Sequence, residues 1–230
     1  MALCRRMADM RHWPLFDLRL RTPDLELRLP TLDDLDALAD LAAEGIHDPE
    51  EMPFAAPWTD AEPAERARET LQFHWRKWAS WKPDDWSLDF VAVRDGTVVG
   101  TQGIYARNFA VVREVGTGSW VGRKYQGQGI GTQMRAAVLH LAFAGLNAEY
   151  ACSGAFTDNP ASLAVSRKLG YQPDGINLHS RRGKRATEQR LRLSRRDWEA
   201  SQNGAKVEVG IEGLQPCLSF FGLSDEPTHQ

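Results

Sequence analysis

The chain has 230 residues and a formal net charge of −3 at pH 7. This length suits one domain with a substantial core, and the weak acidic balance argues against a dedicated nucleic-acid-binding protein, which normally carries a basic excess. The three cysteines, Cys4, Cys152 and Cys217, have neither paired nor metal-ligand spacing, so we expect a cytoplasmic protein with no bound metal. No apolar run approaches the length of a membrane span, and residues 1–13 lack the hydrophobic stretch of a secretion signal.

The first part of the sequence alternates strand and helix patterns. Residues 16–29 have the pattern of strands, and residues 31–44 predict a helix that is capped by a threonine and has leucines on one apolar face. Residues 62–80 predict a second helix, with Trp75 and Trp78 spaced for one buried face.

The dipeptide Asp95-Gly96 is a strong signal for a two-residue hairpin turn, here between strands at 87–94 and 97–105. Residues 206–211 begin an additional strand or hairpin, and the apolar run 218–221 is expected to cover the core. The alternative for that run is self-association into a homo-oligomer. The remaining pattern predicts two helices, at 133–140 and 159–170, and core strands at 113–121, 149–155, 171–179 and 186–193.

The segment 125–132 (YQGQGIGT) places three glycines on alternate positions directly before a helix-forming run. Glycines let the backbone curl, and the helix directs its free amides and positive dipole end into the curl, a construction that binds phosphate or pyrophosphate. A P-loop would need Lys-Ser or Lys-Thr after the last glycine, and a Rossmann fingerprint would need G-x-G-x-x-G and an acidic residue ending a second strand. The spacing G-x-G-x-G meets neither requirement.

The pattern Q-x-x-G-x-G, met by Gln126, Gly129 and Gly131, resembles the coenzyme A pyrophosphate loop of the GNAT superfamily of N-acyltransferases. The segment DNPASLAVSRKLGY at 158–171 is similar to the Asn-led helix of that family. Residues 24–41 resemble the RimJ/RimL-like branch, the ribosomal-protein acetyltransferases. The runs MRHWPLFDLRL and DDWSL further resemble a bacterial succinyl-CoA-using member, and the resemblance covers about residues 10–222.

The resemblance implies a single α+β domain of the GNAT fold over residues 1–230, with about 1–12 as a flexible N-terminus and about 201–230 as a C-terminal extension. In that fold, a mixed, mostly antiparallel central sheet has helices on both faces, and a splayed strand pair holds the acyl-CoA. The implied co-substrate is acetyl-CoA or succinyl-CoA. The residues implied to bind it are Trp120, Val121, Gln126, Gly127, Gln128, Gly129, Ile130, Gly131, Thr132, Asn159, Ser162 and Lys168.

The resemblance also suggests catalytic residues. Many superfamily members have a tyrosine, the acid that protonates the departing thiolate, where this chain has Ser166; the alternative is that Ser166 is a small, buried helix residue. Glu114 lies on the strand where family bases are often found. His47 and Glu44 follow the first helix, in the region that shapes the acceptor pocket of relatives, and histidine is a common general base. Tyr171 is a spare hydroxyl that we expect to pack in the core.

Two other groups have open interpretations. Trp58, Trp81 and Trp86 lie outside or at the edge of the second helix, so we expect them to wall an acceptor groove suited to a peptide or a bulky amine. The basic run at 181–185 is expected to be a solvated loop, and the alternative is contact with a phosphate or with the carboxylate of a succinyl donor.

These features predict an acyl-CoA-dependent N-acyltransferase that moves an acetyl or succinyl group to a primary amine by direct attack. The amine could belong to a protein N-terminus, a lysine or a small molecule. No cysteine lies in a motif that suggests a covalent intermediate. The alternatives are a non-catalytic acyl-CoA-binding sensor, which the missing tyrosine favours, and a Rossmann-type dehydrogenase. The expected partners are acyl-CoA and an amine acceptor, with no nucleic acid and no membrane.

Overall fold

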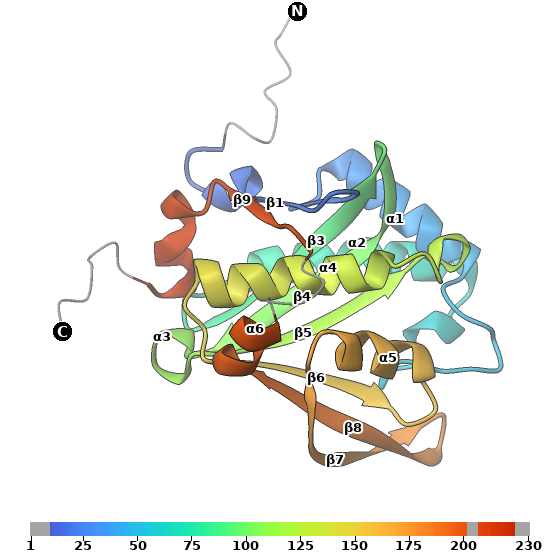
Figure 1. Cartoon of the computed structure of the whole chain (residues 1–230). Coiled ribbons are helices and arrows are strands. Elements are labelled where there is room, and N and C mark those ends of the chain that lie inside the picture. Colours follow the sequence, from blue (N-terminus) through green and yellow to red (C-terminus); the bar gives the residue numbers. More distant parts are fainter. Residues whose placement is uncertain (1–9, 202–206, 224–230) are drawn as a thin grey trace, which may run out of the picture.

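Figure 1 shows the computed structural model of the chain, which describes residues 10–201 and 207–223. Within these residues, nine strands form one sheet in the order β7-β8-β6-β5-β4-β3-β2-β1-β9. Every neighbouring pair is antiparallel except β5 and β6, which are parallel. Most of the predicted flexible N-terminus, residues 1–9, lies outside the described residues.

Two short strands and a capped helix begin the fold. β1 (Arg19–Arg21) and β2 (Glu26–Arg28) divide the predicted strand region 16–29 into a hairpin. The start of α1 (Leu32–Glu44) is fixed by a capping box, in which Thr31 Oγ1 accepts a hydrogen bond from the Asp34 amide at 3.1 Å and Asp34 Oδ2 accepts one from the Thr31 amide at 3.0 Å.

The next helix and hairpin agree with the sequence patterns. α2 (Pro63–Ala79) leads into β3 (Asp85–Arg94) and β4 (Thr97–Arg107), the two longest paired strands of the N-terminal half. Asp95 and Gly96 both have positive φ angles, 50° and 76°. Positive φ at both central residues is the geometry of a type I′ turn, which glycine and aspartate tolerate. The predicted hairpin is therefore confirmed.

The second half of the chain builds the other end of the sheet. α4 (Ile130–His140) begins earlier than the predicted 133–140 and continues into a π-helical turn at Leu141–Gly145, while α3 (Phe109–Val112) and α6 (Arg195–Ser201) were missed because each is short. The elements are α3 (Phe109–Val112), β5 (Glu114–Val121), α4 (Ile130–His140), β6 (Tyr150–Phe156), α5 (Pro160–Lys168), β7 (Gln172–Arg181), β8 (Lys184–Ser194), α6 (Arg195–Ser201) and β9 (Gly210–Glu212).

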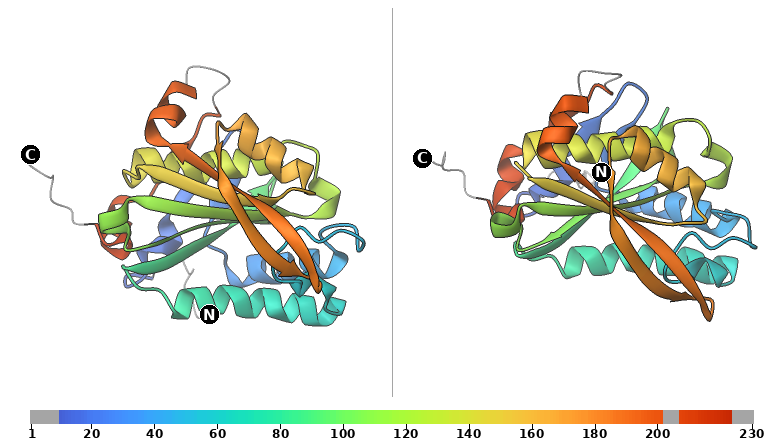
Figure 2. Two further views of the ribbon diagram at one scale, coloured as in Figure 1. Left: turned by 90° about the horizontal axis from the view of Figure 1, so that it is seen from below. Right: turned by 60° about the horizontal axis from the view of Figure 1, so that its bottom comes forward.

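Helices cover both faces of the sheet (Figure 2): α1 and α2 lie on one side, and α4 and α5 lie on the other. We call these sides the α1/α2 face and the α4/α5 face. Trp120 of β5 packs against the buried cluster that contains Leu38 of α1, which places Trp120 on the α1/α2 face. Because side chains alternate along a strand, Gly118 shares that face, whereas Thr117 and Ser119 belong to the α4/α5 face. The predicted α+β fold, with a mostly antiparallel sheet between helices, is confirmed.

The C-terminal segment completes the core. β9 pairs with β1 at the edge of the sheet, and Phe221 is fully buried. Trp81 donates its indole N–H to the Phe220 carbonyl at 3.0 Å and stacks on Trp86 with ring centroids 6.0 Å apart. The apolar run 218–221 therefore covers the core, as expected. No helix in the described part of the chain is both long and apolar enough to cross a membrane.

The parallel pair β5–β6 separates after a short stretch. Its register is Glu114 opposite Tyr150, Val115 opposite Ala151, and Gly116 opposite Cys152, and it ends there. Beyond that point β5 remains paired with β4 as far as Val121, and β6 remains paired with β8 as far as Phe156. We call the opening between the two strands beyond Gly116 and Cys152 the fork. Figure 1 shows β6 diverging from β5 there.

Candidate functional site

The glycine loop lies at the open end of the fork. Gly127 and Gly129 have φ angles of 73° and 79°, in the left-handed region that favours glycine, and a Cβ at either would meet no atom within 4 Å. Both glycines are therefore required by the backbone conformation rather than by crowding. A Cβ at Gly131 would lie 3.9 Å from Val121 Cγ2 and 4.0 Å from Val165 Cγ2. The first turn of α4 thus sits between the end of β5 and α5.

The loop presents a run of backbone amides with no internal partner. The amide of Gln126 donates to the Arg123 carbonyl at 3.3 Å, and the amides of Thr132 and Gln133 donate to the Gly129 carbonyl at 3.1 Å. Among the described residues, no partner exists for the amides of 127–131. These five N–H groups and the positive dipole end of the 11-residue helix α4 create a site for an anion with several oxygens.

Side chains hold this loop in place. Gln126 Nε2 donates to the Ile46 carbonyl at 2.7 Å and to the Val121 carbonyl at 2.8 Å, so its amide hydrogens tie the loop to β5 and to the segment after α1. Gln128 Oε1 accepts a hydrogen bond from Arg94 at 2.8 Å, and Gln128 Nε2 donates to the Lys124 carbonyl at 3.1 Å. The two glutamines therefore shape the loop, and its backbone remains available.

The start of α5 also faces the fork region. Asn159 Oδ1 accepts a hydrogen bond from the Ser162 amide at 3.1 Å, which confirms its predicted role as a helix cap. Ser162 is half-buried, while Lys168 is exposed at the last position of the helix. Ser166 is fully buried, and its hydroxyl has no hydrogen-bond partner among the described residues.

A buried arginine spans the floor of the fork. Arg135 of α4 is 4 % exposed and donates to Ser153 Oγ at 2.9 Å and to Ser119 Oγ at 3.4 Å. Thr117 Oγ1 and the Tyr171 hydroxyl lie 3.4 Å apart in the same region. Burial raises the pKa of Tyr171, and the nearby Arg135 opposes that shift. No sequence pattern indicated Arg135, because one arginine in an amphipathic helix usually faces solvent.

On the α1/α2 face, three glycines make room for three polar side chains. A Cβ at Gly103 would lie 2.6 Å from Asp89 Oδ1. Likewise, a Cβ at Gly116 would collide with the Tyr105 ring, and one at Gly154 would collide with the Glu188 carboxylate. Between them, a Cβ at Gly118 would meet nothing within 4 Å. The surface over Gly118 is therefore unoccupied, and we call it the open floor. It lies beside the fork, with two acids and a phenol around it. The three side chains are Asp89, Tyr105 and Glu188.

The two acids differ in their surroundings. Burial raises the pKa of Asp89, although its Oδ2 accepts a hydrogen bond from Ser87 at 2.8 Å that favours the charged form. Glu188 Oε2 instead lies 2.9 Å from His179 Nε2 and 3.0 Å from Asn177 Nδ2. A pKa raised by burial is a property expected of a carboxylate that acts as a general base, so Asp89 is the better base candidate of the two. Sequence patterns did not indicate it, because Asp89 looks like any polar residue in an alternating strand.

Aromatic rings line one end of this open floor. Trp58 lies 6.2 Å from Trp120 and 5.3 Å from Phe54, and Phe54 lies 5.8 Å from His47, all measured between ring centroids. Trp58 is thus placed beside β5. The expectation for Trp81 and Trp86 was wrong, because both pack into the core with the C-terminal segment. Trp75 was also misassigned to the core, since it is 46 % exposed.

The three sequence-derived base candidates all have other partners, and Glu44 is paired with Lys124 at 2.9 Å. Glu114 starts β5 at its paired end, and its carboxylate lies 3.1 Å from Arg192 Nη2. His47 is half-buried, with Nε2 2.7 Å from Thr59 Oγ1 and Nδ1 2.8 Å from the Asp48 carbonyl. The structure therefore brings the loop residues, Trp120, Val121, Asn159 and Ser162 together around the fork, and leaves Glu114 at the opposite end of β5.

The basic run after β7 is not a simple solvated loop. Arg181 pairs with Asp158 and donates to the Met52 carbonyl at 2.7 Å. Arg182 pairs with Asp60 and donates to the Pro49 carbonyl at 3.0 Å. These two arginines clamp the β7–β8 hairpin onto the segment between α1 and α2, whereas Lys184 and Arg185 are exposed.

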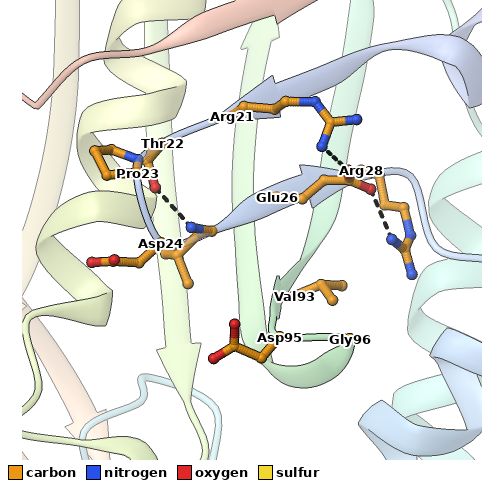
Figure 3. A pocket seen from close by; sticks show the side chains of 10 residues that line it. Arg21, Thr22, Pro23, Asp24, Glu26, Arg28, Val93, Asp95 and Gly96 are labelled. Atoms are coloured by element: carbon orange, nitrogen blue, oxygen red, sulfur yellow. Dashed lines mark hydrogen bonds and ion pairs between the residues drawn. The ribbon is translucent and has the colours of Figure 1, made fainter.

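A separate pocket lies between the β1–β2 and β3–β4 turns (Figure 3). Its volume is about 310 Å³, and its charged lining is mutually paired, with Glu26 between Arg21 and Arg28. This pocket borders α4, because Gln133 Nε2 donates to Asp24 at 2.7 Å and Gln133 Oε1 accepts from Thr22 at 2.8 Å. Both arginines of its lining are paired with acids, so the pocket offers a ligand no unpaired cation.

Comparison with known proteins places the fold. Residues 24–172 match the family profile described as an acetyltransferase (GNAT) domain. A GNAT-family acetyltransferase from Bacillus anthracis has 15 % sequence identity and a TM-score of 0.62, covering 77 % of this chain and 99 % of its own. RimL, a ribosomal-protein α-N-acetyltransferase in complex with coenzyme A, has 17 % identity and a TM-score of 0.59, covering 75 % and 95 %. A chimera of the Vibrio cholerae spermidine N-acetyltransferase SpeG has 15 % identity and a TM-score of 0.61, covering 76 % and 98 %.

Proposed function

The chain belongs to the acetyltransferase (GNAT) family, and from that premise we propose that it transfers an acyl group from acyl-CoA to a primary amine by direct attack. The observation that carries this proposal is the run of five amides at 127–131 that have no partner in the described part of the chain, at the start of α4 and beside the fork. A pyrophosphate is the ligand chemistry that such a loop accepts, and the structural likeness to RimL in complex with coenzyme A supports this choice.

The donor is acetyl-CoA or succinyl-CoA in this proposal. The unpaired edges of β5 and β6 beyond Gly116 and Cys152 supply backbone groups for the amides of a pantetheine arm. Trp120, Val121, Asn159 and Ser162 border this path, and Lys168 is proposed to reach the outer phosphate. Likeness to the RimJ/RimL-like branch supports acetyl transfer, and the succinyl alternative rests on the sequence resemblance.

The acceptor amine would approach on the α1/α2 face, over Gly118. Asp89 is the base that the geometry favours, because it borders the open floor and burial raises its pKa. Glu114 and His47 remain the candidates from sequence, but each would first have to leave a partner. Holding amine and thioester in one place would supply much of the rate enhancement.

Ser166 remains the sequence-derived candidate for protonating the leaving thiolate. Its hydroxyl is buried and unpartnered among the described residues, so it has a hydrogen to donate, but serine is a weak acid. The presence of a weakly acidic serine in place of a tyrosine favours the second candidate function, a non-catalytic acyl-CoA sensor. A sensor would bind the donor and release no thiol with any amine.

One experiment tests the function directly. Purified protein would be examined by native mass spectrometry for a co-purifying acyl thioester, and then mixed with acetyl-CoA or succinyl-CoA and a panel of peptide, lysine and polyamine acceptors. Free thiol release that depends on an amine supports the transferase. Tight donor binding with no release supports the sensor, and no binding of any coenzyme A species overturns both.

A further inference from the structure

Arg135 is a buried cation without a counter-ion. Its side chain is 4 % exposed, and it forms no ion pair among the described residues. Charged side chains are rarely buried unless they are paired, because removal from water costs several kcal/mol. The fold therefore maintains an uncompensated positive charge beneath the fork.

The neighbours of Arg135 are hydroxyl groups, which solvate a cation but do not neutralise it. Ser153 and Ser119 accept hydrogen bonds from its two terminal nitrogens, at 2.9 and 3.4 Å. The third nitrogen, Nε, is buried and has no partner in the described parts of the chain. Tyr171 and Thr117 complete the surroundings, with their hydroxyl oxygens 3.4 Å apart. The cluster is thus prepared for an anion that residues 10–201 and 207–223 do not supply.

The position of the cluster indicates which anion. Arg135 lies five residues beyond the first residue of α4, or about 7.5 Å along the helix axis from the free amides. Ser119 lies two residues before the end of β5, or about 7 Å along the strand. Both elements therefore lead from the proposed pyrophosphate site inward along the fork, toward where β5 and β6 meet.

We propose that Arg135 binds the sulfur of coenzyme A as it leaves as a thiolate. This inference rests on the proposed function. The amine nitrogen bonds to the thioester carbon, the carbon–sulfur bond breaks with its electron pair going to sulfur, and the proton lost by nitrogen goes to Asp89. The guanidinium balances the thiolate charge without transferring a proton, so the weak acidity of Ser166 is no obstacle. The thiolate later takes a proton from solvent, and Asp89 releases to solvent the proton that it took from the amine.

The face of the sheet on which Arg135 lies favours the thiolate, and not the carboxylate of a succinyl group, as the anion that Arg135 binds. Arg135, Ser119 and Ser153 are on the α4/α5 face, with α4 itself. The open floor at Gly118, where the acyl carbon meets the amine, is on the α1/α2 face. The acyl tail would therefore extend away from Arg135, while the sulfur side of the bond points toward it.

The test measures the pKa of the coenzyme A thiol while it is bound. Thiolate absorbance in the ultraviolet is followed against pH for complexes of the wild type, Arg135→Gln and Arg135→Lys. An opposite charge within about 4–6 Å lowers a pKa by about 1–3 units, so the pKa of the bound thiol in the wild type should be at least about 1 unit lower than in Arg135→Gln. Arg135→Lys should retain part of the shift.

A ligand without sulfur provides the matched control. Desulfo-coenzyme A should bind the wild type and Arg135→Gln equally at pH 8, whereas coenzyme A should bind the wild type more tightly. Ser153→Ala keeps the cation and removes one hydrogen bond, so it should keep most of the shift. If Arg135→Gln does not fold, Arg135→Lys and Ser153→Ala still test the inference.

Three results would overturn this inference. They are equal thiol pKa values in the wild type and Arg135→Gln, an equal loss of affinity for coenzyme A and desulfo-coenzyme A, and a loss confined to succinyl-CoA. In each case the wild type still binds a coenzyme A species, so the proposed function survives. A wild type that binds neither coenzyme A nor its desulfo form removes the proposed function itself, and the inference with it.

Discussion

The two faces of the sheet at the fork are built in different ways. On the α4/α5 face, one continuous segment, residues 119–135, contributes the end of β5, the glycine loop, the free amides and Arg135. On the α1/α2 face, the polar groups around Gly118 come from β3, β4 and β8, and the aromatic wall comes from the segment after α1. Donor recognition is therefore local in sequence, whereas acceptor recognition is assembled by the fold.

This difference has a physical origin. Phosphate oxygens are matched by backbone N–H groups, which one loop can supply if its glycines permit the conformation. A base and an acceptor wall need side chains at specific places around a reacting atom, and only neighbouring strands bring these together. The faces should therefore respond separately to substitution, one through donor affinity and the other through turnover and acceptor binding.

The largest separation is expected from Asp89→Asn. Loss of a positioned base typically costs about 10²–10⁴-fold in rate, so kcat/KM for the amine should fall within that range. Coenzyme A affinity, measured by calorimetry, should remain unchanged because Asp89 is on the α1/α2 face. An equal loss of donor affinity would contradict the separation of the two faces.

The pH profile sharpens the same test. A base must be deprotonated, and burial raises the pKa of Asp89, so kcat/KM should rise with pH through a value above that of an ordinary aspartate. Ser87→Ala removes a hydrogen bond that favours the carboxylate. The rising limb of the kcat/KM profile should therefore move to still higher pH, and kcat/KM should reach the same plateau. Asp89→Asn should lose the limb. A limb that Ser87→Ala does not move assigns the base elsewhere.

A smaller effect is expected from Gly129→Ala on the donor side. Alanine at a φ of 79° costs roughly 1–2 kcal/mol, so the loop should relax and coenzyme A should bind about tenfold more weakly. Gly183→Ala is the matched control, because Gly183 has a φ of 71° with no atom near its Cβ and lies in the β7–β8 turn. It should lose similar stability and keep donor affinity. If Gly129→Ala and Gly183→Ala bind coenzyme A equally well, this would count against the glycine loop as the donor site.

The smallest effect is expected from Trp58→Ala. Trp58 is placed by its contact with Trp120, and the loss of one ring contact with the acceptor costs about 0.5–1.5 kcal/mol. The KM of a peptide or bulky amine should therefore rise a few-fold, while donor affinity stays the same. Trp75→Ala is the control, because Trp75 is 46 % exposed on α2. An unchanged acceptor KM in Trp58→Ala would remove Trp58 from the acceptor wall.

Sequence patterns recovered what is encoded locally. The Thr31 cap, the Asp95-Gly96 turn and the Asn159 cap each depend on a few adjacent residues, and all three are present. The α+β fold and the family were predicted from the resemblance of the glycine loop and the Asn-led helix to those of the GNAT superfamily. Asp89 and Arg135 were not found, because their importance arises from neighbours such as Gly103 and Ser153, which are distant in the sequence.

The aromatic residues show the same limit. Trp58, Trp81 and Trp86 have similar local surroundings in the sequence, but Trp81 and Trp86 bury themselves against Phe220 and Phe221 near the other end of the chain. Burial between segments so far apart cannot be read from periodicity. Trp58 is placed instead by its contact with Trp120.

The central claim is that the amides of 127–131 hold the diphosphate of coenzyme A. Residue-resolved amide hydrogen exchange, measured by NMR with and without saturating coenzyme A, tests it most directly. We predict that exchange slows at 127–131, and that the amides of Thr132 and Gln133, which are already bonded to Gly129, change less. Bound coenzyme A with unchanged exchange at 127–131, and new protection elsewhere, would contradict the account.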